Sequence, residues 1–369
     1  MVELKKVNLG DIITFKNGKK KPAEEGTIPI YGGNGILGYT DRSNYKNCIA
    51  VGRVGAYCGS VYYEPGECWI SDNAIAATPK ADVDIYFAFY LLKSLNLNQR
   101  HIGTSQPLLT QEILNKIECQ IPDLDIQKKI SNILRTVDGK VECNTAINRN
   151  LSEQAQAMVH EWEETEKDNI EYKTVADVAE LNPDTYSPKE EWDFVNYLDT
   201  SSITEGTISE LTYIIPSTEK LPSRARRKLI ADDIVYSTVR PNQKHYGYIN
   251  QPEQNMLAST GFVVVRANKK LVSSQLLYLL ITRDIVTEKM QQIAEGSTST
   301  FPSIKPSDLG TYEIPVPKAG FRTNLIDGLD YIFKCMYSNQ QENRRLADLR
   351  DCLLPKLMSG KLDVSDLEI

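Results

Sequence analysis

The chain carries the same amphipathic helix pattern twice, 195 residues apart. In each copy, residues recur at alternating spacings of four and three, mostly apolar but with two asparagines at matching places. The first copy is Ile130, Leu134, Val137, Val141, Asn144, Asn148, Leu151, Ala155 and Met158, and the second is Leu325, Leu329, Ile332, Met336, Asn339, Asn343, Leu346, Arg350 and Leu353. Only Ala155 against Arg350 breaks the match. Such spacing is typical of a coiled-coil seam, so the two helices can pack on each other.

The paired asparagines are candidates for setting the register of that seam. A buried asparagine layer costs some stability but fixes how two helices align. Four residues would form this layer: Asn144, Asn148, Asn339 and Asn343. In an antiparallel pair these central positions would lie near one another. The alternative is that two unrelated amphipathic helices share a common heptad pattern.

The repeat continues upstream of each helix. The same features follow one another in both copies: a strand-like run, an apolar helical stretch, a turn of small polar residues with a proline, and an Ile-Pro step. They lie at 48–51, 86–92, 103–107 and 121–122 in the first copy and at 233–237, 276–280, 296–302 and 314–315 in the second. A period this long indicates duplicated domains, because solenoid units have about 20–50 residues. We therefore expect the order globular domain, long helix, globular domain, long helix.

Length and composition are consistent with that order. The 369 residues leave room for two domains of the usual size plus helical connectors. We expect no signal peptide and no membrane span, because no apolar run is long enough for either. Seven cysteines without tight spacing favour the reducing cytoplasm. Cys48, Cys58 and Cys68 have no C-x-x-C partner and no histidine nearby in sequence, so we expect no metal and no cofactor.

The net charge of −7 argues at first against a nucleic-acid partner, but the charge is unevenly distributed. Residues 16–53 and 219–244 each hold seven basic side chains against three acidic ones, whereas residues 151–193 hold thirteen acids against three lysines. One basic segment in each domain, with an acidic region elsewhere, is typical of a protein that binds a polyanion through one face. The alternative is that these short basic runs are solvated loops.

Two glycine-rich motifs lie within the first basic segment. Four glycines fall within residues 32–38, which predicts either a turn beside a DNA backbone or a plain hairpin. Arg53 lies between glycines after a predicted strand, where its guanidinium could bind phosphate or guanine, or could be an exposed hairpin side chain. Arg240 is its approximate counterpart in the second half, with Pro241 where a glycine would fall.

The basic segments supply the candidate DNA-binding residues. These are Lys19, Lys20, Lys21, Arg42, Lys46, Arg53, Arg224, Arg226, Arg227, Lys228, Arg240 and Lys244. Nearby tyrosines could contact sugars or base edges, although most tyrosines are partly buried strand residues. They are Tyr31, Tyr39, Tyr45, Tyr246 and Tyr248.

No catalytic constellation is visible in the sequence. A D-P-P-Y or N-P-P-Y tetrad for base methylation is absent, since residues 182–185 read Asn-Pro-Asp-Thr. There is no G-x-S-x-G elbow, and residues 171–173 lack the upstream acid pair of a nuclease site. The three histidines are scattered, so no general base stands out. These absences favour a recognition protein over an enzyme.

The chain resembles the specificity (S) subunit of type I restriction–modification systems over essentially its whole length. The resemblance rests on the duplicated order of domain and helix and on four segments. These are residues 31–36 (YGGNGI), 51–55 (VGRVG), 296–298 (GST) and 353–362 (LLPKLMSGKL).

The resemblance implies an α+β fold with two globular target-recognition domains, separated by two long antiparallel coiled-coil helices with an internal pseudo-two-fold repeat. Each recognition domain would read one half of a bipartite DNA target. The helices would dock two methyltransferase (M) subunits, which nuclease–translocase (R) subunits join, and the S subunit itself would not be an enzyme. The expected boundaries are 1–122 and 169–317 for the recognition domains, 123–168 for the first spacer helix and linker, and 318–369 for the second spacer helix and tail.

Helix length gives an expected spacing between the half-sites. A helix of about 30 residues is about 45 Å long, which corresponds to on the order of 13 base pairs. Because the two domains differ in sequence, their half-sites should differ and the target should be asymmetric. Two alternatives stay open: a self-contained DNA-modifying enzyme with an unrecognised motif, and a structural adaptor that binds no DNA.

Overall fold

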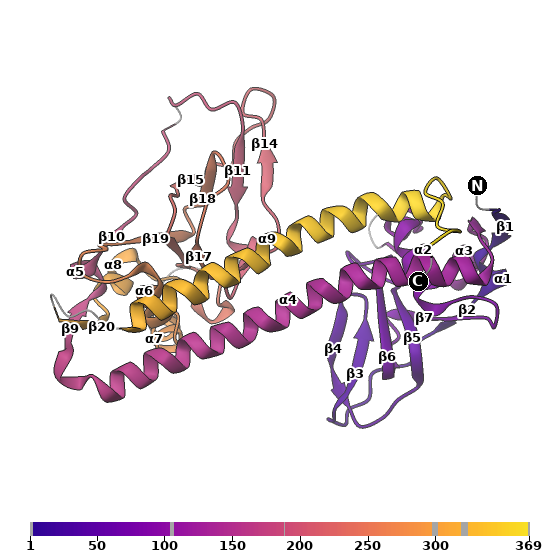
Figure 1. Cartoon of the computed structure of the whole chain (residues 1–369), viewed down its shortest axis with the longest axis horizontal. Coiled ribbons are helices and arrows are strands. Elements are labelled where there is room, and N and C mark those ends of the chain that lie inside the picture. The colour runs from indigo at the N-terminus through magenta and orange to yellow at the C-terminus, as the bar shows by residue number, and fades with distance from the viewer. Residues whose placement is uncertain (1–2, 104–106, 188, 297–301, 319–323, 368–369) are drawn as a thin grey trace. The chain divides into compact units, whose positions relative to one another are not determined.

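The structure is a computed structural model that describes residues 3–103, 107–187, 189–296, 302–318 and 324–367. Parts of the two predicted small-residue turns, 104–106 and 297–301, lie outside the described residues. The chain divides into two compact units, residues 1–144 with 341–369 and residues 145–340. Each unit contains one α+β domain and parts of two long helices, α4 (Leu124–Thr165) and α9 (Asn324–Met358) (Figure 1).

The first domain is built on a six-stranded sheet in the order β2-β7-β5-β6-β3-β4. Its strands are β2 (Ile13–Asn17), β3 (Ile28–Gly32), β4 (Gly35–Thr40), β5 (Tyr45–Gly52), β6 (Val61–Ile70) and β7 (Ala74–Pro79). Neighbouring strands are antiparallel except β3 and β6, which are parallel. The remaining elements are α1 (Leu9–Ile12), α2 (Ile85–Ser94), α3 (Gln111–Asn115) and the pair β1 (Lys5–Asn8) and β8 (Glu118–Ile121).

The second domain contains two four-stranded sheets, in the orders β10-β19-β16-β17 and β14-β11-β18-β15. The first comprises β10 (Ala179–Leu181), β16 (Asp233–Ser237), β17 (Tyr246–Ile249) and β19 (Phe262–Ala267). The second comprises β11 (Val195–Leu198), β14 (Thr212–Ile214), β15 (Ala225–Lys228) and β18 (Met256–Ser259). The remaining elements are α5 (Val175–Val178), α6 (Ser274–Ile281), α7 (Asp284–Glu295), α8 (Pro306–Gly310) and the pairs β12 (Ile203–Thr204) with β13 (Thr207–Ile208) and β9 (Ile170–Thr174) with β20 (Glu313–Pro317).

The predicted duplication is confirmed in the backbone. The strand order β2-β7-β5-β6 of the first domain recurs as β10-β19-β16-β17 in the second. The amide of Leu9 donates to Ile117 O at 2.9 Å, and that of Val175 donates to Tyr312 O at the same distance. The four-residue helices α1 and α5 each begin with a capping box, which ties the amides of the first turn to side-chain acceptors. Both predicted apolar helical stretches lie in corresponding helices, α2 and α6.

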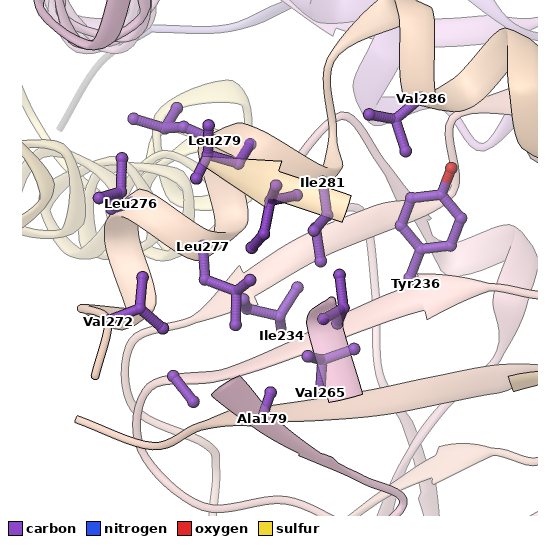
Figure 2. Packing of buried hydrophobic residues seen from close by; sticks show 14 of the residues in the cluster. Ala179, Ile234, Tyr236, Val265, Val272, Leu276, Leu277, Leu279, Ile281 and Val286 are labelled. Carbon is purple, nitrogen blue, oxygen red and sulfur yellow. The ribbon is translucent and has the colours of Figure 1, made fainter. Parts of the chain in front are cut away.

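Helix α6 packs on the β10-β19-β16-β17 sheet because its apolar residues recur on one face. Leu277 and Ile281 lie over Ile234 and Val265 of the sheet (Figure 2). The same buried cluster continues into the long helices, where it includes Ala155, Val159, Trp162, Leu329, Ile332 and Phe333. The core of the second domain is thus continuous with the helix seam of its unit, and the core of the first domain likewise includes Ile130, Leu134 and Leu357.

The long helices run antiparallel within each unit, as expected. In the first unit Asp138 lies opposite Arg350, and in the second unit Met158 lies beside Gly328. The helices have 42 and 35 residues, so they are longer than the expected 30. The added length of α4 continues the apolar stripe beyond the seam, since Val159 and Trp162 are both buried. Within the described ranges, no helix combines the length and apolar character needed to cross a membrane.

Candidate nucleic-acid interface

The two glycine-rich motifs of the first domain lie against each other. Residues 32–35 form the turn of the β3–β4 hairpin, a geometry that fits both of the predicted alternatives. Ser60 donates its hydroxyl to Gly33 O, which ties this turn to the loop after β5. A Cβ on Gly52 would overlap Tyr57 O and lie 2.9 Å from Gly33 O. Glycine is therefore required where the two loops meet, and the proposed DNA contact of the turn stays a prediction.

Arg53 is held firmly by its backbone at the end of β5. Its amide donates to Asn73 O at 3.0 Å, and its carbonyl oxygen accepts from the Leu109 amide at 2.9 Å and from the Cys58 thiol at 3.2 Å. The residue is half-buried, and its buried Nε has no hydrogen-bond partner among the described residues. A guanidinium nitrogen without a partner is unusual in a folded protein, and a ligand acceptor would satisfy it.

The counterpart of Arg53 in the second domain is Thr238, which corrects the pairing with Arg240. The Thr238 amide donates to Gly261 O at 2.8 Å, and its carbonyl oxygen accepts from the Ile304 amide at 2.9 Å, which repeats the Arg53 pattern. Arg240 corresponds instead to Gly55, since their amides donate to Pro302 O and Pro107 O. Both have positive φ, 48° and 77°. The predicted pairing of Arg240 with Arg53 was wrong by two positions, because it matched arginine with arginine rather than the end of one strand with the end of the other.

The basic run of the second domain lies mainly on β15. Arg224 is exposed before the strand, whereas Arg226 and Arg227 are half-buried. Burial lowers the pKa of Arg227, and its Nε has no hydrogen-bond partner among the described residues. Lys228 forms an ion pair with Glu190 at 2.5 Å and lies over the Trp192 ring. Arg226, Arg227 and Lys228 therefore lie on β15 with Arg224 immediately before it, but Lys228 is already neutralised.

Two other candidates also have acidic partners. Arg42 contacts Glu24 at 2.7 Å. Lys244 contacts Asp284 at 2.8 Å and Glu205 at 3.2 Å, and these two hydrogen bonds raise the Lys244 pKa. Lys19, Lys20, Lys21 and Lys46 are exposed. Because an ion pair must break before its cation contacts phosphate, the exposed lysines, Arg53, Arg224 and Arg227 are the stronger candidates.

The structure also separates the tyrosines. Tyr31 and Tyr246 are buried and belong to the cores, while Tyr248 hydrogen-bonds Asp232 at 2.5 Å. Tyr39 is 54% exposed on β4, the outer strand of the sheet.

Exposed apolar side chains lie beside the glycine turn, and the sequence patterns did not single them out. Ile36 and Leu37, on β4 immediately after the turn, are 48% and 43% exposed, and Tyr57 in the facing loop is 54% exposed. Their signal was available, because apolar residues follow a glycine turn without the alternation of a half-buried strand. Exposed apolar side chains beside basic residues suit contact with thymine methyl groups or base edges.

The four seam asparagines form two pairs. Asn144 Nδ2 donates to Asn343 Oδ1 at 2.9 Å in the first unit, and Asn339 Nδ2 donates to Asn148 Oδ1 at 2.8 Å in the second. Asn144 Nδ2 also lies 2.7 Å from the Glu342 carboxylate, a partner that the heptad pattern did not reveal because Glu342 lies beside the seam. The expected proximity is confirmed within each pair, and the role in register stays a prediction.

No group of three or more His, Cys, Asp or Glu side chains in the described part of the chain is arranged to hold a metal ion. All seven cysteines are free thiols.

Comparison with known proteins identifies the family. The family model for the type I restriction modification DNA specificity domain matches residues 1–153 and 167–347. The specificity subunit of the type I restriction enzyme EcoprrI from Escherichia coli is 30% identical over 148 residues, 40% of this chain and 37% of that protein. The specificity subunit of HindI from Haemophilus influenzae is 26% identical over 165 residues, 44% of this chain and 36% of that protein. The matched segments thus span little more than a third of those two relatives.

The fold agrees with the family model. A crystal structure of the type I restriction–modification S subunit from M. genitalium superposes with a TM-score of 0.61 at 18% identity, covering 97% of this chain and 96% of that one. At this identity the likeness shows the fold alone. The family match covers both copies of the internal repeat and thus most of the sequence. The chain belongs to the type I restriction modification DNA specificity domain family.

Proposed function

We propose that this chain is the DNA sequence-specificity subunit of a type I restriction–modification complex. Each globular domain reads one half of a bipartite, asymmetric target, and the long helices dock two methyltransferase subunits, which nuclease–translocase subunits join. The chain itself is not an enzyme, needs no cofactor and acts in the cytoplasm. The recognition domains comprise residues 1–122 and 169–317, with spacer helices in 123–168 and 318–369.

One observation carries the proposal. The two domains share a backbone frame but present different side chains at equivalent places on it. Arg53 corresponds to Thr238, and Gly55 corresponds to Arg240, although their main-chain hydrogen bonds match. Contacts between side chains and bases determine which DNA sequence a protein binds. Two domains that recognise different half-sites therefore need different side chains on their common backbone.

The experiment is to reconstitute the chain with the methyltransferase subunits of its own system and to sequence the modified bases of host DNA. The expected result is methylation at one asymmetric bipartite motif, absent when this chain is omitted. Complexes with Arg53→Ala and, separately, Arg227→Ala should each alter discrimination in a different half of that motif. Methylation by this chain alone, or a palindromic motif, would contradict the proposal.

A further inference from the structure

The seam repeat breaks at Ala155 and Arg350, and this pair belongs to a group of equivalent positions that differ between the two units. Arg350 of α9 forms an ion pair with Asp138 of α4, with 3.1 Å between Nη1 and Oδ1. Tyr90 of α2 donates its hydroxyl to the other oxygen of Asp138, Oδ2, at 2.6 Å. The Arg350 and Asp138 side chains are 27% and 23% exposed. The first unit thus contains a largely buried, charged layer that joins α2, α4 and α9.

The second unit has apolar residues at all three equivalent positions. Phe333 corresponds to Asp138, and Ala155 to Arg350, at the 195-residue period. Leu279 corresponds to Tyr90, because α2 and α6 begin at equivalent capping residues, each of which accepts a hydrogen bond from the amide three residues later. All three apolar residues are buried in one cluster. The three positions therefore differ together, from a charged set to an apolar set.

A second pair of positions differs in the same way. Lys140 of α4 contacts Glu342 of α9 at 3.3 Å in the first unit. The equivalent residues of the second unit are Cys335 and Ile147. Here too both members are charged in one unit and uncharged in the other.

Size is matched as well as charge. In the second unit the end of the Met158 side chain occupies the space that a Cβ on Gly328 would fill. The equivalent residues in the first unit, Ile133 and Leu353, are both large, and both pack against the first core. The small residue of α9 thus accommodates the long side chain of α4.

These matches hold only when α4 lies against α9. If α4 lay in the same antiparallel register against a second α4, Asp138 would face Ala155 and lose its ion pair with Arg350. Lys140 would face Ile147, and Ile133 would meet Met158 where only glycine now fits. Two α9 helices would in turn place Phe333 opposite Arg350. The loss of an ion pair at a partly buried position and the overlap of two large side chains both disfavour such pairs.

We propose that α4 and α9 select each other, because the matched charged and apolar layers make α4 complementary to α9 and not to a second copy of itself. The asparagine pairs cannot make this choice, since both helices carry them at the same positions. Two helices with nearly the same seam are thereby kept in one pairing, and copies of the chain do not associate through like helices.

The first test exchanges one layer in the full-length chain. Arg350→Ala alone should lower Tm by about 5 °C, because Asp138 loses its ion pair with Arg350. The triple variant Tyr90→Leu, Asp138→Phe and Arg350→Ala installs the apolar layer of the second unit. Its Tm should return to within about 2 °C of the parent, since matched positions couple. A triple variant that is destabilised as much as the three single changes added together would overturn the proposal.

The second test measures partner choice directly. Two differently tagged copies of the full-length chain are co-expressed with a photo-crosslinking residue in place of Ile147 on α4. Cross-links should join α4 to α9 of the same chain. The variant with Phe333→Asp and Arg350→Ala gives α9 the residues of α4 at two positions, and α4–α4 cross-links between tags should then increase severalfold. Abundant α4–α4 cross-links in the parent chain would overturn the proposal, whether or not the chain reads DNA.

Discussion

The two globular domains keep the same frame near the long helices and differ away from them. In the first domain a single strand, β6, pairs with β5 from Val61 to Cys68 and with β3 at Trp69 and Ile70. In the second domain the same path is divided into β17 and β18. The second domain therefore has two four-stranded sheets where the first has one six-stranded sheet.

The two domains also differ in the loops that follow the equivalent strands β5 and β16. In the first domain β5 ends at Gly52, and Arg53 follows it directly. The second domain has Ser237 and Thr238 at the equivalent positions and reaches its arginine two residues later. A common frame with different loops suggests that stability belongs to the frame and specificity to the loops.

The largest expected effect concerns the shared frame. Leu134 and Leu329 are equivalent seam residues, both fully buried. Replacing either with alanine should reduce the free energy of unfolding by about 2–5 kcal/mol, because a cavity forms in a packed seam. Hydrogen exchange should show each change loosening its own unit more than the other, with the exposed Leu349→Ala as the control. Equal loosening of both units by one change would mean that they unfold as one.

The frame was predictable from sequence because its signals are periodic or local. The heptad seam, the Ile-Pro steps and the apolar stretches of α2 and α6 depend on nearby residues. The ion pairs were not predictable, since Glu190 reaches Lys228 and Asp284 reaches Lys244 only through the fold. The assignment of Arg240 was wrong for a related reason: residue type resembled Arg53, whereas only the hydrogen-bond pattern locates the true equivalent.

The second prediction compares the two loops. Gly52→Ala should destabilise the chain by about 1–3 kcal/mol, because the added methyl group meets the backbone at Tyr57 and Gly33. The equivalent Ser237 already has a Cβ, so Ser237→Ala should cost only about 1 kcal/mol, because its hydrogen bond to Val239 O is removed. Thermal denaturation of both variants measures the difference. Equal effects would show that the glycine contact is not required for packing.

A third prediction concerns the basic strand of the second domain. Replacing Arg224, Arg226 and Arg227 with alanine should weaken binding of the reconstituted complex to DNA, because phosphate neutralisation supplies much of the affinity. The slope of log affinity against log salt should fall by about 0.9 for each DNA phosphate that the protein no longer neutralises. Lys228→Ala is the matched control, since Glu190 already neutralises this lysine, and its slope should stay near that of the parent. An unchanged slope in the triple variant would identify the run as a solvated surface.

The smallest effect on stability, and the sharpest on geometry, is expected at the asparagine pairs that both units share. Changing Asn144 and Asn343 together to leucine removes both members of one pair, so neither amide is left facing an apolar partner. Stability should change by no more than about 1 kcal/mol, since replacing both partners of a hydrogen bond can be nearly neutral. The change of Asn148 and Asn339 to leucine tests the other unit in the same way.

If these asparagine pairs fix the register of the helices, either variant should tolerate a DNA spacer one base pair longer or shorter than the parent accepts, because leucine seams align less specifically. Binding of reconstituted complexes to targets with altered spacers measures this. An unchanged spacer preference in both variants would show that the matched layers around Asp138 and Phe333, where the units differ, are sufficient to align the helices.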